Sequence, residues 1–198
     1  LMESNGLSDE ELFHTGLSHI QHESSRLHQM VIQLLEMSDK ELHTQLMPLD
    51  LAATLNSVAA SMSLKARRYN NKIITKGLTS LIILGHEERI RQLFINLIDN
   101  AIKYGQPKED IIADAFLKDD RAVVQITNKG EGIIPEELNH IFDPFYRVDK
   151  EHSREIGSAG LGLSICQKIM AEHQGVITVD SEPGVSTTFT VSFTAYKE

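Results

Sequence analysis

The chain has 198 residues, of which 41% are hydrophobic and 24% charged, and its formal net charge is −9. These values are typical of a globular protein with room for one good core and an appendage. The acidic balance argues against nucleic acid as a partner, because phosphate backbones reward basic patches. No apolar run approaches the ~20 residues that a membrane-spanning helix needs, and the single Cys166 excludes an internal disulfide framework.

The first helix that the sequence predicts follows Ser8, a plausible N-cap with Glu11 three residues later, and ends near Glu41. Apolar or small residues recur in it with alternating spacings of three and four, at Leu17, Ile20, Ser24, Leu27, Val31 and Leu34. This is the seam of a helix bundle. A lone helix cannot bury such a stripe, so it requires a missing helix, a second chain or the following domain.

The rest of the chain mixes helices and strands without strict alternation. Helices are predicted from about residue 49 to 68, from 85–88 to 105–107, and from about 161 to 173. Strands are predicted at 72–76, 80–84, 111–117, 121–127, 176–180 and 187–194, with the last two pairs forming hairpins. Such a pattern favours an α+β fold in which helices cover one face of a sheet.

The segment 90–105 is the organising stretch of the chain. Wound as a helix, it places its apolar residues on one broad face, and it lines up Asn96, Asn100 and Lys103 on the opposite face. Two carboxamides in line with an ammonium group can offer neutral oxygens to a hard cation and a positive charge to phosphate. The alternative is an ordinary solvated helix side that happens to hold two asparagines.

Four further features accompany this helix. Asn128 opens a turn with Gly130 and Gly132 directly after a strand, and the segment 141–147 sets aromatic rings around Arg147. The segment 157–163 is glycine-rich and runs into a helix, whose N-terminus would favour phosphate. The last strand opens with two threonines at 187–188. Each feature is weak alone, but the set in this order is specific.

These motifs resemble the ATP-binding catalytic domain of two-component sensor histidine kinases. Residues 96–104 are similar to the N box of that family, 128–133 to its first glycine box, 142–147 to its F box and 157–163 to its second glycine box. The resemblance covers about residues 44–195. It implies a catalytic ATP-binding domain at 44–198, and at 1–43 part of the dimerisation and phosphotransfer region, namely the second helix of its hairpin. The implied fold is a two-layer α/β sandwich of the Bergerat type, a mixed sheet with helices on one face, preceded by a bundle-forming helix.

The resemblance also implies roles for individual residues. Asn100, helped by Asn96, would ligate Mg²⁺, and Lys103 and Arg147 would bind the phosphates of ATP, which makes Asn100, Lys103 and Arg147 the catalytic set. Asn128 and Thr188 would hold adenine. Further nucleotide contacts are implied for Tyr104, Gly130, Gly132, Ile133, Leu161 and Leu163, and a mobile lid for Gly157, Gly160 and Gly162.

The activity that the resemblance implies is transfer of the γ-phosphoryl group of ATP to a histidine, for relay to an aspartate of a response regulator receiver domain. It also implies a homodimer in the full-length protein, which would be membrane-anchored with this domain in the cytoplasm. The acceptor motif of the family is a histidine followed by an acidic residue, with proline five positions after the histidine. His22 has Leu27 at the proline position, and His19 is followed by Ile20. We therefore expect the acceptor on a helix upstream of Leu1, and a chain that cannot phosphorylate itself.

Two alternatives remain open at this stage. An ATPase of the gyrase and mismatch-repair kind would need a glutamate at Asn96 to activate water. A degenerate module that only binds nucleotide is favoured by Asn128, which stands where the family usually has aspartate, because a carboxamide accepts a hydrogen bond more weakly than a carboxylate.

Overall fold

The structure of the protein is a computed structural model that describes residues 13–18, 20–21, 24, 31, 45–77, 80–148 and 160–196. The chain divides into two units, Leu1–Ser38 and Asp39–Glu198. The sequence-based boundary between residues 43 and 44 falls in a stretch outside the described residues and stays a prediction. No helix in the described part of the chain is long and apolar enough to cross a membrane.

In the first unit, all the described residues are helical, in agreement with the predicted helix at these positions. Its apolar side chains are exposed to solvent, with exposed fractions of 44% for Leu17, 68% for Ile20 and 55% for Val31. Ser24, the small residue of the predicted seam, is exposed as well, and the two remaining members, Leu27 and Leu34, lie outside the described residues.

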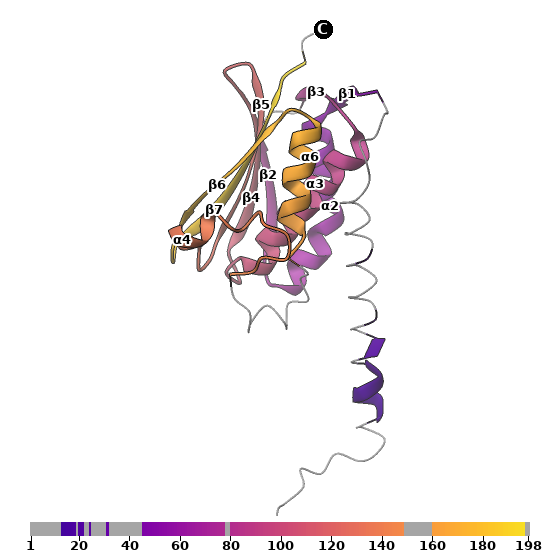
Figure 1. The fold of residues 1–198 in the computed structure, drawn as a ribbon, viewed down its shortest axis with the longest axis vertical. Coiled ribbons are helices and arrows are strands. Elements are labelled where there is room, and N and C mark those ends of the chain that lie inside the picture. The colour runs from indigo at the N-terminus through magenta and orange to yellow at the C-terminus, as the bar shows by residue number, and fades with distance from the viewer. Residues whose placement is uncertain are drawn as a thin grey trace, which may run out of the picture. The chain divides into compact units, whose positions relative to one another are not determined.

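The second unit is built on a mixed five-stranded sheet in the order β2-β4-β5-β7-β6 (Figure 1). Strand β2 (Lys72–Gly77) runs parallel to β4 (Asp110–Lys118), and the antiparallel neighbours that follow are β5 (Arg121–Lys129), β7 (Ser186–Thr194) and β6 (Val176–Glu182). A small antiparallel sheet pairs β1 (Met47–Asp50) with β3 (Ile82–Gly85). Both hairpins that the sequence predicts are confirmed.

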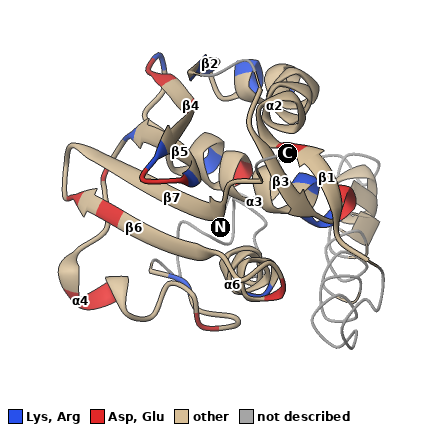
Figure 2. Cartoon of the chain, turned by 90° about the horizontal axis from the view of Figure 1, so that it is seen from above, with Lys and Arg blue, Asp and Glu red and all other residues tan. Residues whose placement is uncertain are grey.

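Three helices cover one face of the large sheet: α2 (Leu51–Arg68), α3 (Glu87–Tyr104) and α6 (Gly162–Glu172). Figure 2 views them nearly end-on beside the strands, with α3 between the other two. The predicted α+β fold, a mixed sheet with helices on one face, is therefore confirmed. A short fourth helix, α4 (Pro135–Leu138), lies near the β6–β7 end of the sheet and was not predicted, since four residues carry no periodic signal.

Helix α3 is the centre of the core. Its sequence begins with acidic residues and ends with Lys103, which complements the helix dipole. Its core-facing side chains are all buried, namely Ile90, Leu93, Phe94, Leu97, Ile98, Ala101 and Ile102. In β4 every second residue from Ile111 to Ala115 is buried, and in β5 every second residue from Ala122 to Asn128 is buried, with Val123 buried in addition. This alternation follows the two-residue period of a strand.

The start of α2 is fixed by Asp50. The sequence predicts a helix from about residue 49, whereas in the structure β1 ends at Asp50 and the side chain of Asp50 is the N-cap of α2. Its Oδ1 accepts hydrogen bonds from the backbone N–H groups of Ala52 at 2.9 Å and Ala53 at 3.2 Å, and also from that of Leu81 at 3.1 Å. Burial raises the pKa of this carboxyl group, but the donors, which include the Ser80 hydroxyl, outweigh burial and leave the pKa below its usual value.

We predict that Asp50→Ala destabilises the domain by about 1–2 kcal/mol, which lowers the melting temperature by about 2–8 °C. Because the pKa is lower in the folded state, the carboxylate stabilises the fold above pH ~4, and this contribution is lost as the pH falls through the folded pKa. Melting curves of parent and variant should therefore converge as the pH is lowered from neutrality through the folded pKa. Asp180→Asn, on the exposed edge strand β6, is the control. A difference that stays constant with pH would contradict the assignment.

Candidate functional site

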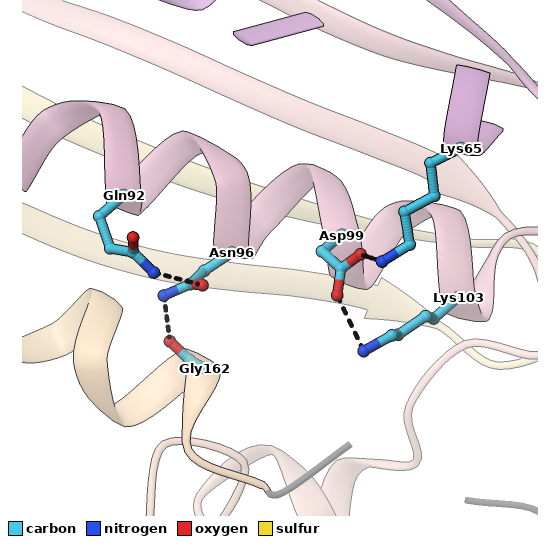
Figure 3. Close-up of polar contacts among 6 residues, drawn as sticks. All are labelled: Lys65, Gln92, Asn96, Asp99, Lys103 and Gly162. Atoms are coloured by element: carbon cyan, nitrogen blue, oxygen red, sulfur yellow. Dashed lines mark hydrogen bonds and ion pairs between the residues drawn. The ribbon is translucent and has the colours of Figure 1, made fainter. Parts of the chain in front are cut away.

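The polar side of α3 carries more groups than the sequence analysis named. Gln92, Asn96, Asp99, Asn100 and Lys103 are all partly exposed, whereas the apolar residues between them are buried except for Ile95. Figure 3 shows four of these polar side chains, those of Gln92, Asn96, Asp99 and Lys103. The predicted division of this helix into an apolar and a polar face is confirmed. Gln92 and Asp99 were not predicted as members of this polar face. Because they lie four residues before Asn96 and Lys103, helical spacing could have identified them as neighbours of these two residues.

Asn96 joins α3 to the beginning of α6. Its Oδ1 accepts a hydrogen bond from Gln92 Nε2 at 3.2 Å, and its Nδ2 donates to the carbonyl of Gly162 at 3.3 Å. Both ends of the amide are therefore in use. These contacts hold the start of α6 against α3 at Gly162, and help from Asn96 in ligating Mg²⁺ stays a prediction.

Asn100 is the carboxamide that remains available on this face. Its side chain makes no hydrogen bond within the part of the chain that the structure describes, and it is partly exposed. Among the same residues, no group of three or more His, Cys, Asp or Glu side chains could hold a metal ion. One neutral oxygen fits Mg²⁺ where phosphate oxygens and water complete the octahedron, because Mg²⁺ is commonly held by few protein ligands together with substrate phosphates.

Lys103 lies in an ion-pair cluster. Its Nζ is 2.8 Å from Asp99 Oδ2, and the other oxygen of Asp99 bonds to Lys65 of α2 (Figure 3). Burial raises the pKa of Asp99, but the two lysine ammonium groups, Lys103 first, outweigh burial and hold the pKa below its usual value. The lysine that the sequence assigns to phosphate therefore already has a carboxylate partner.

Asn128 lies at the end of β5, beside the last turn of α3, with 5% of its surface exposed. Its Nδ2 points at two backbone oxygens, those of Tyr104 and Lys129, both at 3.4 Å. Flipping the amide by 180° would place Oδ1 against these two carbonyl oxygens, where it could not form a hydrogen bond. The hydrogen-bond partners therefore fix the orientation of the amide. It leaves Oδ1 as the acceptor, which is what an adenine amino group requires.

The glycines of the first glycine box have a structural role in packing the turn. Their contact with a nucleotide, which the resemblance implies, stays a prediction. A Cβ on Gly130 would lie 2.4 Å from the carbonyl oxygen of Tyr104, and Gly132 has φ +71 with its Cβ position 2.6 Å from the carbonyl oxygen of Glu182. Both glycines therefore let the turn pack between the end of α3 and the β6–β7 turn. Ile133 is fixed there by its N–H, which donates to Ser181 Oγ at 2.9 Å.

The structure does not bring Thr188 to Asn128. In the β5–β7 register, Asn128 pairs with Thr187 and Thr127 with Thr188, so Thr188 lies on the outer face of the sheet, where its hydroxyl is 2.9 Å from that of Thr127. Thr187 is the threonine on the helix side, 6% exposed. Because strand residues alternate between faces, the buried Phe189 could have identified Thr187 from sequence.

The F box is fastened to its surroundings at two points. The N–H of Phe145 donates to the carbonyl of Gly160 at 2.9 Å, and the hydroxyl of Tyr146 donates to Glu137 of α4. Gly160 has φ +73, and a Cβ there would lie 2.8 Å from the carbonyl oxygen of Tyr146. The F box and the second glycine box are therefore packed together at this point.

Arg147 follows directly and carries the most informative polar group of the site. Its Nε and one terminal nitrogen are buried, and they find no hydrogen-bond partner among the described residues. Burying guanidinium nitrogens without a partner is costly, so this side chain, which is partly exposed as a whole, fits an anion supplied by a ligand.

The second glycine box is described from Gly160 onward, and Gly157 lies outside the described residues. Leu161 is fully buried and precedes the first turn of α6, which has no side-chain cap. Gly162 and Leu163 are partly exposed in that turn. Cys166, further along α6, is buried, and burial raises the pKa of its thiol to about 12, which agrees with a structural rather than a reactive residue.

Comparison with known proteins matches residues 85–197 to the family described as histidine kinase-, DNA gyrase B-, and HSP90-like ATPase. Similar proteins include the sensor protein RprX of Bacteroides fragilis, 33% identical over 90% of this chain and 36% of its own length. The sensor histidine kinase YkoH of Bacillus subtilis is 32% identical over 98% of this chain and 42% of its own length. The chain thus spans less than half the length of these relatives.

Solved structures of histidine kinases resemble this chain as well. The catalytic domain of the histidine kinase ThkA superimposes with a TM-score of 0.67 at 26% identity, covering 76% of this chain and 96% of that domain. Full-length ShkA shares the fold with a TM-score of 0.79 at 23% identity, over 98% of this chain and 41% of its own. With its motifs placed around α3 as described, the chain belongs to the histidine kinase-, DNA gyrase B- and HSP90-like ATPase family, and within it to the ATP-binding domains of sensor histidine kinases.

Proposed function

We propose that this domain binds Mg-ATP and transfers the γ-phosphoryl group to a histidine nitrogen on a helical segment, for relay to an aspartate of a response regulator receiver domain. The observation that carries the proposal is the guanidinium of Arg147, whose Nε and one terminal nitrogen are buried and lack a hydrogen-bond partner among the described residues. A nucleotide phosphate would supply the anion that it lacks. The structure of ShkA is a complex with AMPPNP, and we extend nucleotide binding to this chain on the strength of the shared fold.

Each residue then has a role that its surroundings support. The Oδ1 of Asn128 accepts a hydrogen bond from the amino group of adenine, and Thr187 lies beside it in place of Thr188. Asn100 would hold Mg²⁺, which would neutralise phosphate charge. Lys103, Arg147 and the N-terminus of α6, which has no side-chain cap, contact the phosphates. Phosphoryl transfer depends on positioning and electrostatic stabilisation more than on covalent help from the protein.

Asn96 favours a kinase over an ATPase of the gyrase kind. A hydrolase needs a group at this position that activates water by taking its proton. A carboxamide does not accept a proton near neutral pH, and the amide of Asn96 is occupied by Gln92 and Gly162. The nucleophile therefore comes from outside the site.

The partners that we propose follow from the same kinship and concern the whole protein. The exposed apolar residues of the first unit, Leu17, Ile20 and Val31, support assembly of a homodimer through a helical bundle. The names of the relatives, which are sensor proteins and sensor kinases, support a cytoplasmic placement of this domain in a membrane-anchored sensor.

The direct test is titration with ATP and Mg²⁺ by calorimetry and thermal shift. At a ligand concentration about a hundred times the Kd, binding should stabilise the domain by about 2.7 kcal/mol and raise the melting temperature by about 5–10 °C. No heat of binding and no thermal shift at millimolar Mg-ATP would refute the proposal.

The Mg²⁺ site is tested by Asn100→Ala. Because the carboxamide oxygen that remains available on this face is lost, we expect Mg²⁺ to improve ATP affinity about tenfold less in the variant than in the parent. Asn100→Asp separates charge from geometry, since a carboxylate still holds the metal but repels phosphate. Gln125→Ala, which removes a carboxamide bonded to Thr190 on the outer face of the sheet, is the control. An unchanged Mg²⁺ dependence in Asn100→Ala would move the metal elsewhere.

Adenine recognition is tested by Asn128→Ala. Loss of one partner of a buried hydrogen bond costs about 1–3 kcal/mol, so ATP affinity should fall about ten- to a hundredfold. The parent should prefer ATP to GTP, because Oδ1 accepts and guanine offers a carbonyl at the same edge. Thr188→Ala should bind ATP as the parent does, since its side chain lies on the outer face of the sheet. Equal affinities of the parent for ATP and GTP would exclude a base-reading role for Asn128.

The chain itself should not become phosphorylated. None of its nine histidines has both an acidic residue directly after it and a proline five positions later. Incubation with γ-labelled ATP should leave it unlabelled, whereas a longer form of the protein with a matching histidine should be labelled by it in trans. Acid-labile, stoichiometric labelling of this chain alone would overturn the expectation, and His22→Ala would locate the acceptor.

A further inference from the structure

Asp99 connects two helices through two lysines. Its Oδ2 lies 2.8 Å from Nζ of Lys103, one turn further along α3, and its Oδ1 bonds to Nζ of Lys65, which comes from α2. Figure 3 shows the carboxylate between the two ammonium groups, on the polar side of α3 that also carries Asn96. Neither Lys65 nor Asp99 belongs to the site residues that the family resemblance implies.

The three side chains differ in their access to solvent. Their exposed fractions are 14% for Lys103, 23% for Asp99 and 42% for Lys65. The pair within α3 is therefore the sheltered one, and its order, with the acid four residues before the base, is the favourable one on a helix. Lys65 is the outer member of the cluster.

The charges of the cluster do not balance, since two ammonium groups share one carboxylate. A lysine ammonium has three donors, so Lys103 can bond to Asp99 and still reach a phosphate oxygen. As a phosphate draws Lys103 away, Asp99 loses part of its compensation. A partly buried carboxylate without a partner is costly, and Lys65 is placed to prevent this.

We propose that Asp99 stores Lys103 in an ion pair from which the nucleotide phosphates recruit it, and that Lys65 keeps Asp99 compensated as this happens. Lys65 and Asp99 are thus positioning residues for phosphate binding, and Lys65 acts without touching the nucleotide. This inference rests on the proposed nucleotide-binding function.

Each substitution is expected to change ATP affinity in a definite direction. In Lys65→Gln, Asp99 has Lys103 as its remaining partner in the cluster and holds it more tightly, so ATP affinity should fall about two- to tenfold. Adenosine affinity should not change, because adenosine has no phosphate. In Asp99→Asn there is no charge to compensate, so adding Lys65→Gln to this background should have no effect on ATP affinity.

The experiment is a double-mutant cycle measured by calorimetry with ATP and with adenosine, on the parent, Lys65→Gln, Asp99→Asn and the double variant. Lys118→Gln is the matched control, because it removes one positive charge at the exposed end of β4, away from α3. Melting curves establish that all variants fold. The expected result is a fall in ATP affinity when Lys65→Gln is made in the parent, with adenosine affinity unchanged and no such fall when it is made in Asp99→Asn.

Other results would overturn the inference in distinguishable ways. If the parent does not bind ATP, the proposed function itself fails. If the parent binds and Lys65→Gln binds equally well, the ion-pair exchange is wrong. Equal losses for ATP and adenosine would make Lys65 merely structural. A loss that persists when Lys65→Gln is combined with Asp99→Asn would mean that Lys65 attracts the phosphates directly.

Discussion

The structure depends on the packing of one helix, α3, against the sheet. Seven of its side chains are buried in the core, and burial of this size is the dominant favourable term in folding. Since the helix is rigid and cannot rotate without exposing these side chains, its opposite side is fixed too. The polar residues Asn96, Asp99, Asn100 and Lys103 are therefore held in place by hydrophobic burial on the other side of the same helix.

The remaining parts of the site are attached to α3 by short polar contacts. At its C-terminal end, the carbonyl of Tyr104 receives the Asn128 amide, and Gly130 packs against the same oxygen. In its middle, Asn96 bonds to Gly162 at the start of α6. The expected base position, at Asn128, and the expected phosphate position, at the start of α6, are thus both fixed by contacts with one helix. A shift of α3 would change them together, which makes this helix the element that couples the two ends of the nucleotide.

The sequence was sufficient for the features that have a long period or a specific order. The apolar face of α3, both hairpins and the α+β layer could be predicted because helical and strand periodicities are visible over ten residues or more. What could not be predicted depends on contacts distant in sequence. The pairing of Asp99 with Lys65 requires knowledge that α2 packs beside α3. The need for glycine at position 130 comes from the carbonyl of Tyr104, which lies on a different element of the chain. The elements β1 and α4 are each four residues long, which is too short for a periodic signal. Thr188 is a different case. The alternation of apolar and polar residues in β7 is visible in the sequence, and it places Thr187, and not Thr188, on the helix side of the sheet.

The two cations that we assign to the phosphates, Arg147 and Lys103, differ in their surroundings. Two nitrogens of the partly exposed Arg147 are buried and lack a partner among the described residues, so their desolvation is already part of the fold, and a phosphate would offset it. Lys103 has a carboxylate partner at 2.8 Å, so a phosphate would replace one ion pair with another. Only the difference in free energy between these two ion pairs would contribute to binding. The residue types suit these tasks. A guanidinium stays charged in any protein environment and binds planar acceptors in a fixed fork, whereas an ammonium is a point charge on a flexible stem that exchanges partners. Affinity for the phosphates should therefore reside mainly in Arg147, and the response to their arrival mainly in Lys103.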